Sequence, residues 1–147
     1  GNGGYDRLVY KDVPIPKIEE GEVLIKVLAA GVNNTEVNTR LGWYSSSINS
    51  ATNEMSDSKV DLLVQKSDGG WNDKTPFPII QGTDCCGTVV KVASDIGSHL
   101  MGKLVLIRPG GRELGFKALD DIWMGSDIDG GVAQDWKISV TEVFRVI

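Results

Sequence analysis

The sequence has few of the side chains that form disulfides or bind zinc. Its 147 residues include only two cysteines, Cys85 and Cys86, and one histidine, His99. Because the cysteines are adjacent, they cannot cross-link distant parts of a fold, and a reducing, cytoplasmic compartment is expected. The cysteines open an apolar segment, which favours a core position for both. His99 falls in a predicted turn, which favours the surface.

The sequence also lacks a basic run and a long apolar run. The formal net charge is -5 at pH 7, whereas binding a nucleic-acid backbone requires clustered Lys and Arg. The apolar stretch of residues 23–32 is far too short to cross a bilayer, and no basic-then-apolar signal segment opens the chain. We therefore expect neither nucleic acid nor a membrane as a partner.

Glycine is abundant, with 18 residues that fall mostly between apolar runs. This punctuation favours a single, mainly β domain with tight turns. Strands are predicted for residues 22–30, 87–93 and 103–107, the last two as antiparallel neighbours, and for the alternating segment 132–140. Within that last segment Gln134 falls on the apolar face, so we expect it to have a hydrogen-bonding partner.

One short helix is predicted for residues 33–42, because its first three residues carry capping side chains and Gly42 can end it. Residues 45–76 and 108–131 are rich in Gly, Ser, Asn and Asp, which is typical of loops. Loops of this length are usually functional lids or disordered tracts. The first is therefore expected to be a mobile lid or an added substrate-facing structure, with a helical turn or strand at residues 60–65.

Three segments follow one another in a characteristic order. They are residues 21–45 (GEVLIKVLAAGVNNTEVNTRLGWYS), 77–107 (FPIIQGTDCCGTVVKVASDIGSHLMGKLVLI) and 129–147 (DGGVAQDWKISVTEVFRVI). In this combination they resemble the N-terminal GroES-like domain of the medium-chain dehydrogenase/reductase superfamily, which includes zinc-type alcohol dehydrogenases and quinone oxidoreductases. The resemblance implies that residues 1–147 form a partly open β-barrel with a few short helices. Such a domain carries the substrate side of an active-site cleft and takes a small-molecule substrate.

The resemblance also implies a second domain. In the family, a Rossmann domain that binds NAD(H) or NADP(H) follows the GroES-like domain. No G-x-G-x-x-G turn, whose amides would face the cofactor's pyrophosphate, occurs in this sequence. We therefore expect the Rossmann domain to be absent from this chain, to be supplied in cis in the full-length parent, and the chain alone to be inactive. A homodimer of the parent is compatible with this, because family dimers often associate through the cofactor domain.

The resemblance bears on zinc as well. The zinc enzymes have a ligating cysteine at the position of Asn33, a ligating histidine at the position of Thr83, and four cysteines in the loop that corresponds to residues 108–131. A neutral amide and a hydroxyl are poor zinc ligands, and that loop has no cysteine here, so no zinc is expected. Asn33 resembles the zinc-independent quinone oxidoreductase branch. This implies hydride transfer from the reduced nicotinamide to a carbonyl, enone or quinone.

Without a Lewis acid, hydrogen-bond donors must stabilise the charge that builds on the substrate oxygen. Asn33, Thr35 and Tyr44 are the expected donors. Asp84 corresponds to a family position close to the metal and is expected to orient a ligand. The cofactor is expected to approach Asn33, Asn34 and Thr35. Structural alternatives stay open, namely helix capping for Asn33 and Thr35, loop packing for Tyr44, and a solvated turn for Asp84.

Two nearby residues and the overall function also have alternatives. Arg40 could approach the cofactor's phosphates or stabilise the last turn of the helix. Trp43 is expected to shape the substrate pocket, with the role of a core or loop anchor as the alternative. The chain is interpreted as the substrate-side domain of an NAD(P)(H)-dependent oxidoreductase. One alternative is a GroES-like binding module with no chemistry of its own. Another keeps the enzyme but restores zinc through unusual ligands.

Overall fold

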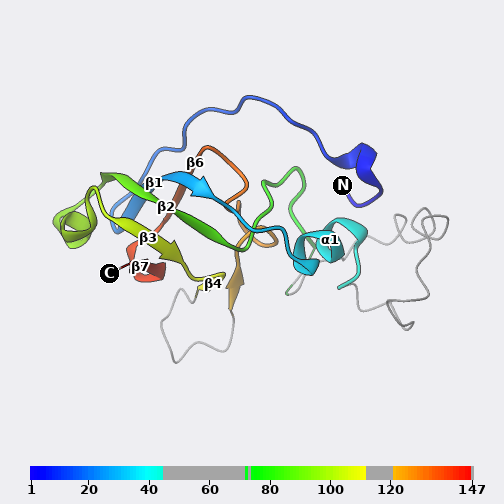
Figure 1. The fold of residues 1–147 in the computed structure, drawn as a ribbon. Coiled ribbons are helices and arrows are strands. Elements are labelled where there is room, and N and C mark those ends of the chain that lie inside the picture. Colours follow the sequence, from blue (N-terminus) through cyan, green and yellow to red (C-terminus); the bar gives the residue numbers. More distant parts are fainter. Residues whose placement is uncertain (45–71, 73, 112–120, 147) are drawn as a thin grey trace.

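The computed structural model describes residues 1–44, 72, 74–111 and 121–146, and most of its strands form one antiparallel five-stranded sheet. The strands lie side by side in the order β6 (Asp135–Ser139), β1 (Glu22–Ala29), β2 (Cys85–Val92), β3 (Leu104–Ile107) and β7 (Val143–Arg145). Figure 1 shows β1, β2 and β3 together, with the helix α1 (Asn34–Leu41) beyond the end of β1. The mainly β fold is confirmed, and so is the antiparallel pairing of β2 with β3.

The sheet is curled, because a very short connection joins its two edge strands. β6 and β7 lie at opposite edges, yet only the three-residue 3-10 helix η5 (Val140–Glu142) separates them in the chain. Five flat strands spaced about 4.8 Å apart would hold the edges about 19 Å apart. Four residue steps span at most about 14 Å even when fully extended. The edges therefore approach each other, as expected for a partly open barrel.

The core fills the inside of the curled sheet. Val23 and Ile25 of β1 have no exposed surface, and Cys85 and Val89 of β2 are also buried. The other buried apolar side chains of this cluster are Leu100, Val105, Ile107, Met124, Trp136 and Ile138. The predicted core position of Cys85 is thus confirmed, whereas Cys86 is half-buried. Burial, with a smaller contribution from the adjacent Cys86, raises the pKa of the Cys85 thiol to about 11.

The last predicted strand begins later than its alternating pattern indicates. β6 starts at Asp135, because the residues before it bind another segment: the Val132 N–H donates to the carbonyl of Gln81 at 2.9 Å. Gln134 consequently precedes the strand and its side chain is exposed. The prediction that Gln134 lies on an apolar strand face and needs a partner there is therefore wrong.

Three very short strands lie where the sequence predicts none. Within residues 108–131, for which the sequence predicts a loop, β4 (Gly110–Gly111) pairs with β5 (Ile122–Trp123), and β7 follows η5 near the end of the chain. Strands of two or three residues contain no alternation of polar and apolar side chains that a pattern could show. The predicted lid of residues 45–76, with its segment 60–65, lies almost entirely outside the described residues.

The described helices are short. Besides α1 and η5 they are the 3-10 helices η1 (Tyr5–Arg7) and η3 (Asp95–Leu100). His99 lies in η3 with an exposed side chain, which confirms its predicted surface position. None of the helices in the described part of the chain has the length and apolar character needed to cross a bilayer.

Candidate active site

The candidate site begins where the chain leaves β1 and enters α1. Asn33 is the N-cap, with an extended backbone, and its N–H donates to Oε2 of Glu36 at 2.5 Å in a capping box. At the other end Gly42 adopts the left-handed conformation, with φ of 70°, and its N–H donates to the carbonyl of Thr39 at 3.1 Å. The predicted helix and the residues that begin and end it are confirmed.

Glu36 links α1 to the turn that precedes β2. Its side chain is buried, and Oε1 accepts both the backbone N–H of Thr83 at 2.7 Å and the hydroxyl of Thr83 at 2.9 Å. The backbone carbonyl of Glu36 accepts the Nε2 amide of Gln81 at 2.9 Å. With the Asn33 N–H, three donors converge on one buried carboxylate, which offsets the cost of removing its charge from water.

Glu36 is not among the site residues predicted from the sequence. The signal that could have found it is its spacing from Asn33, because an acidic residue three positions after an N-cap is the capping-box pattern. That pattern predicts the bond to the Asn33 N–H. It does not predict the bonds to Thr83, which lies 47 residues away.

The Asn33 side chain joins the same two segments on a more exposed side. Its Nδ2 donates to Oδ2 of Asp84 at 2.7 Å and lies 3.3 Å from Oγ1 of Thr83. A side chain at Gly31 would crowd this contact, since an added Cβ would lie 3.0 Å from Oδ2 of Asp84. The structure thus brings together two predicted site residues, Asn33 and Asp84, that are 51 positions apart.

The turn at residues 81–84 is also held from its other side by a glycine pair. The Gly131 N–H donates to the carbonyl of Gly82 at 3.0 Å. An added Cβ on Gly130 would lie 2.2 Å from that same oxygen and 2.9 Å from the carbonyl carbon of Gln81, so no larger residue fits without moving the backbone. Gly130 and Gly131 therefore fix the position of Thr83 and its neighbours.

The other predicted site residues lie along α1. Asn34 and Thr35 form its first turn, directly after Asn33, with Asn34 exposed and Thr35 half-buried. Tyr44 follows the helix, and its hydroxyl lies 3.5 Å from Nδ2 of Asn38, in the C-terminal half of α1. This contact is at the end of the helix away from Asn33, so the convergence of Tyr44 with Asn33 stays a prediction.

Arg40 has a contact that the sequence does not indicate. Its guanidinium donates to the carbonyl of Gly3 and lies 4.9 Å from the centre of the Tyr5 ring, while the Gly3 N–H donates to the carbonyl of Arg40 at 2.9 Å. Nearby, Nδ2 of Asn2 donates to the carbonyl of Thr39 at 2.9 Å. Arg40 is buried by these contacts and holds the N-terminal segment against the end of α1.

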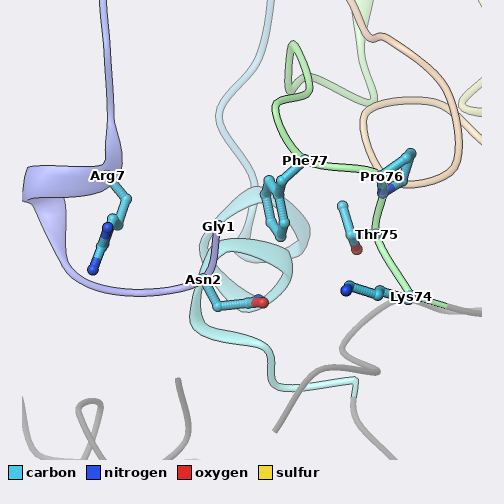
Figure 2. A pocket seen from close by; sticks show the side chains of 7 residues that line it. All are labelled: Gly1, Asn2, Arg7, Lys74, Thr75, Pro76 and Phe77. Atoms are coloured by element: carbon cyan, nitrogen blue, oxygen red, sulfur yellow. The ribbon is translucent and has the colours of Figure 1, made fainter. Parts of the chain in front are cut away.

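A pocket of about 630 Å³ opens between this N-terminal segment and the residues that precede β2 (Figure 2). Its lining residues are Gly1, Asn2, Arg7, Lys74, Thr75, Pro76 and Phe77. The side chains of Asn2 and Lys74 point towards each other across it in Figure 2. Because Asn2 binds the C-terminal end of α1, this pocket is separate from the cluster at Asn33, and no predicted site residue lines it.

The side chains that lie at the two positions of expected zinc ligands, Asn33 and Thr83, are an amide and a hydroxyl. The amide nitrogen of Asn33 faces a carboxylate, and the hydroxyl of Thr83 is bonded to Glu36, so neither thiolate nor imidazole is offered. Among the residues that the structure describes, no three or more His, Cys, Asp or Glu side chains are grouped so as to hold a metal ion. The zinc independence expected from the sequence stays a prediction that metal analysis can test.

Known proteins resemble this chain in sequence and in structure. Residues 19–146 match the model of the alcohol dehydrogenase GroES-like domain. An NAD-dependent alcohol dehydrogenase of Sulfurisphaera tokodaii is 27% identical over 136 residues, which cover 86% of this chain and 33% of that protein. An alcohol dehydrogenase of Geobacillus stearothermophilus is 31% identical over 98 residues, which cover 67% of this chain and 21% of that protein.

The structural likeness extends over the whole chain. A solved structure from Sinorhizobium meliloti, whose description suggests an alcohol dehydrogenase, superimposes with a TM-score of 0.76 at 33% identity. It covers 99% of this chain, which in turn covers 38% of that protein. The chain thus spans less than two fifths of the length of each of these relatives.

Proposed function

Because the chain belongs to the alcohol dehydrogenase GroES-like domain family of the medium-chain dehydrogenases/reductases, we propose that it forms the substrate side of an NAD(P)(H)-dependent oxidoreductase. In the proposed reaction, hydride passes between the nicotinamide and a carbonyl, enone or quinone substrate without zinc. The description of the Sulfurisphaera relative as NAD-dependent supports a nicotinamide cofactor. The chain covers 33% of that relative, so we place the nucleotide-binding domain elsewhere in the full-length protein and expect no turnover from this chain alone.

The observation that carries the zinc-independent part of the proposal is the hydrogen-bonded contact between Asn33 and Thr83. By resemblance, these residues correspond to the two positions where the zinc enzymes have ligands, and here their side chains lie 3.3 Å apart and are hydrogen-bonded to each other. The carboxylate of Asp84 accepts the other amide hydrogen of Asn33, and the carboxylate of Glu36 accepts the hydroxyl hydrogen of Thr83. The turn is therefore held in place by side chains that need no metal.

The groups that we assign to the cleft are those around this contact. The chain's own residues would bind and orient the substrate, while the bound nicotinamide would supply or accept the hydride. We assign Thr35 and Tyr44 as donors towards the substrate oxygen and Asp84 as a group beside it. Asn33, the third donor expected from the sequence, is assigned beside the oxygen instead, because its amide donates to Asp84 and lies 3.3 Å from the Thr83 hydroxyl. Asn33, Asn34 and Thr35 form the edge that we assign to the cofactor.

Metal content and turnover, measured on the same preparation of full-length enzyme, test this proposal. Suitable substrates are an aldehyde, 2-cyclohexenone and 1,4-benzoquinone, each with NADH and with NADPH. We expect far less than one zinc per chain and turnover that survives dialysis against a chelator. One zinc per chain, with turnover lost on chelation, would contradict zinc independence. Absence of turnover with every substrate would favour the non-catalytic binding module.

A further inference from the structure

The hydrogen bonds of the candidate site have a direction, which its two carboxylates impose. The carboxylate of Glu36 can only accept, so the Thr83 hydroxyl donates its single hydrogen across 2.9 Å to Oε1. The lone pairs of the Thr83 oxygen therefore face Nδ2 of Asn33, 3.3 Å away. The carboxylate of Asp84 also can only accept, so the other amide hydrogen of Asn33 is directed to Oδ2 of Asp84.

These bonds use every side-chain hydrogen that Asn33 and Thr83 can donate. The group that the cluster presents outward is then an acceptor, because Asp84 is exposed. Its Oδ2 is held by Asn33 beside Gly31, and no hydrogen bond reaches its Oδ1 from the described residues. A substrate group that binds there must donate a hydrogen bond. The hydroxyl of an alcohol can do so, whereas a carbonyl oxygen offers only lone pairs to a carboxylate.

We propose that Asp84 is the base that takes the hydroxyl proton of an alcohol substrate, and that Asn33 and Glu36 are positioning residues that orient it. This rests on the proposed function and adds to it a role for one residue, Asp84. The juxtaposition that carries it is an exposed carboxylate with one oxygen fixed by Asn33 and the other open.

The proposed step balances in atoms and electrons. The substrate O–H proton passes to Oδ1 of Asp84, and the hydrogen on the same carbon leaves with its electron pair to an oxidised nicotinamide dinucleotide. A C=O bond forms, the alcohol loses two electrons, and the dinucleotide gains them. The proton is then released from Asp84 to water. In the direction of reduction, the same carboxyl group returns a proton to the carbonyl oxygen.

Turnover of the full-length enzyme with benzyl alcohol or 2-butanol, and with NAD⁺ or NADP⁺, tests the role of Asp84. Loss of a general base lowers rates by about 100-fold to 10,000-fold, so we expect at least about a 100-fold lower kcat in Asp84→Ala and Asp84→Asn. Sodium formate should partly restore kcat in Asp84→Ala but not in Asp84→Asn, because only the smaller side chain leaves room for a formate ion. The control is Asp95→Asn, an exposed aspartate in η3 outside the cluster, which should leave kcat unchanged.

A second measurement does not depend on turnover. In NMR spectra of the isotope-labelled full-length protein, the side-chain amide signals of Asn33 are identified by their loss in Asn33→Ala. Both amide protons should exchange slowly with water in the wild type, because each is bonded to a protein oxygen. In Asp84→Ala, one of them should exchange faster.

Each outcome supports or overturns the proposal. A large fall in kcat with rescue by formate supports it. Turnover that survives Asp84→Ala, or that formate does not restore, overturns the role of Asp84 and leaves the oxidoreductase function intact. Asn33 protons that exchange equally fast with and without Asp84 overturn the direction of the hydrogen bonds. No turnover by the wild type with any alcohol or carbonyl overturns both proposals.

Discussion

The buried carboxylate of Glu36 accepts two hydrogen bonds from Thr83, one from its backbone N–H at 2.7 Å and one from its hydroxyl at 2.9 Å. This pair joins the first turn of α1 to the turn before β2. As a result, the neighbours of the two residues, Asn33 and Asp84, come into contact. The geometry of the candidate site therefore depends on a side chain that solvent barely reaches.

The substitution Thr83→Val tests how much this pair stabilises the fold. It removes the hydroxyl bond to Glu36 and keeps the N–H bond, so the free energy of unfolding should fall by about 1.5–3 kcal/mol, the range for hydrogen bonds to charged groups. Urea unfolding, followed by tryptophan fluorescence, to which the buried Trp136 contributes, measures the change. Thr88→Val, at a half-buried position of β2, is the control and should change it by less than about 0.5 kcal/mol. Equal losses of unfolding free energy in the two variants would show that the hydroxyl bond to Glu36 stabilises the fold no more than the hydroxyl of Thr88 does.

A second prediction concerns the glycine pair behind the site. In Gly130→Ala the new Cβ would lie 2.2 Å from the carbonyl oxygen of Gly82, so the backbone must move. We expect a loss of about 3 kcal/mol or more, at the upper end for overpacking. In Gly110→Ala the nearest atom is 3.7 Å away, an ordinary contact, and stability should stay nearly unchanged. Thermal unfolding of both variants checks this, and similar melting temperatures would disprove the steric argument.

The buried thiol of Cys85 predicts how stability depends on alkaline pH. Burial raises its pKa from 9.0 to about 11 in the folded protein. Between those values the unfolded chain has lost the proton and the folded chain has kept it, so the unfolded state binds fewer protons. The free energy of unfolding should therefore fall as the pH rises from about 9 to about 11, and the full contribution should be present below pH 9.

Cys85→Ala provides the comparison for this alkaline effect. Urea unfolding at a series of pH values should show a shallower decline in the variant than in the wild type, because the variant has no thiol at position 85. In the folded wild type, a thiol reagent at pH 8 should modify the half-buried Cys86 well before Cys85. Parallel declines in the two proteins would assign the pH dependence to other groups.

The fourth prediction separates the two ends of α1 in the reaction of the full-length enzyme. Asn33→Ala should lower turnover by roughly tenfold or more, because Asp84 loses the amide that orients it. Tyr44→Phe should also lower turnover by roughly tenfold or more, because its hydroxyl is assigned as a donor towards the substrate oxygen. Asn33→Ala also removes a helix cap, which costs about 1 kcal/mol, so rates must be compared at equal folded fraction. Normal turnover in both variants would leave these residues with a structural role alone.

The parts of the fold that the sequence predicts are those with a local cause. α1 follows from Asn33 at its start and Gly42 at its end, and β1 and β2 follow from long apolar runs between turns. β4, β5 and β7 are not predicted, because strands of two or three residues are too short to show an alternation of polar and apolar side chains. The approach of Asn33 to Asp84 is likewise invisible locally, since it depends on how two segments 51 residues apart pack around Glu36.

The way in which Glu36 holds position 83 has a consequence for the side chains that this position can take. One of its two bonds goes to the backbone N–H, which every residue except proline has, so this anchor persists when the side chain changes. Position 83 can therefore take other side chains while the turn around it keeps this bond to Glu36. Substitutions there change the group that the turn presents, while the backbone that presents it stays held by the same buried carboxylate.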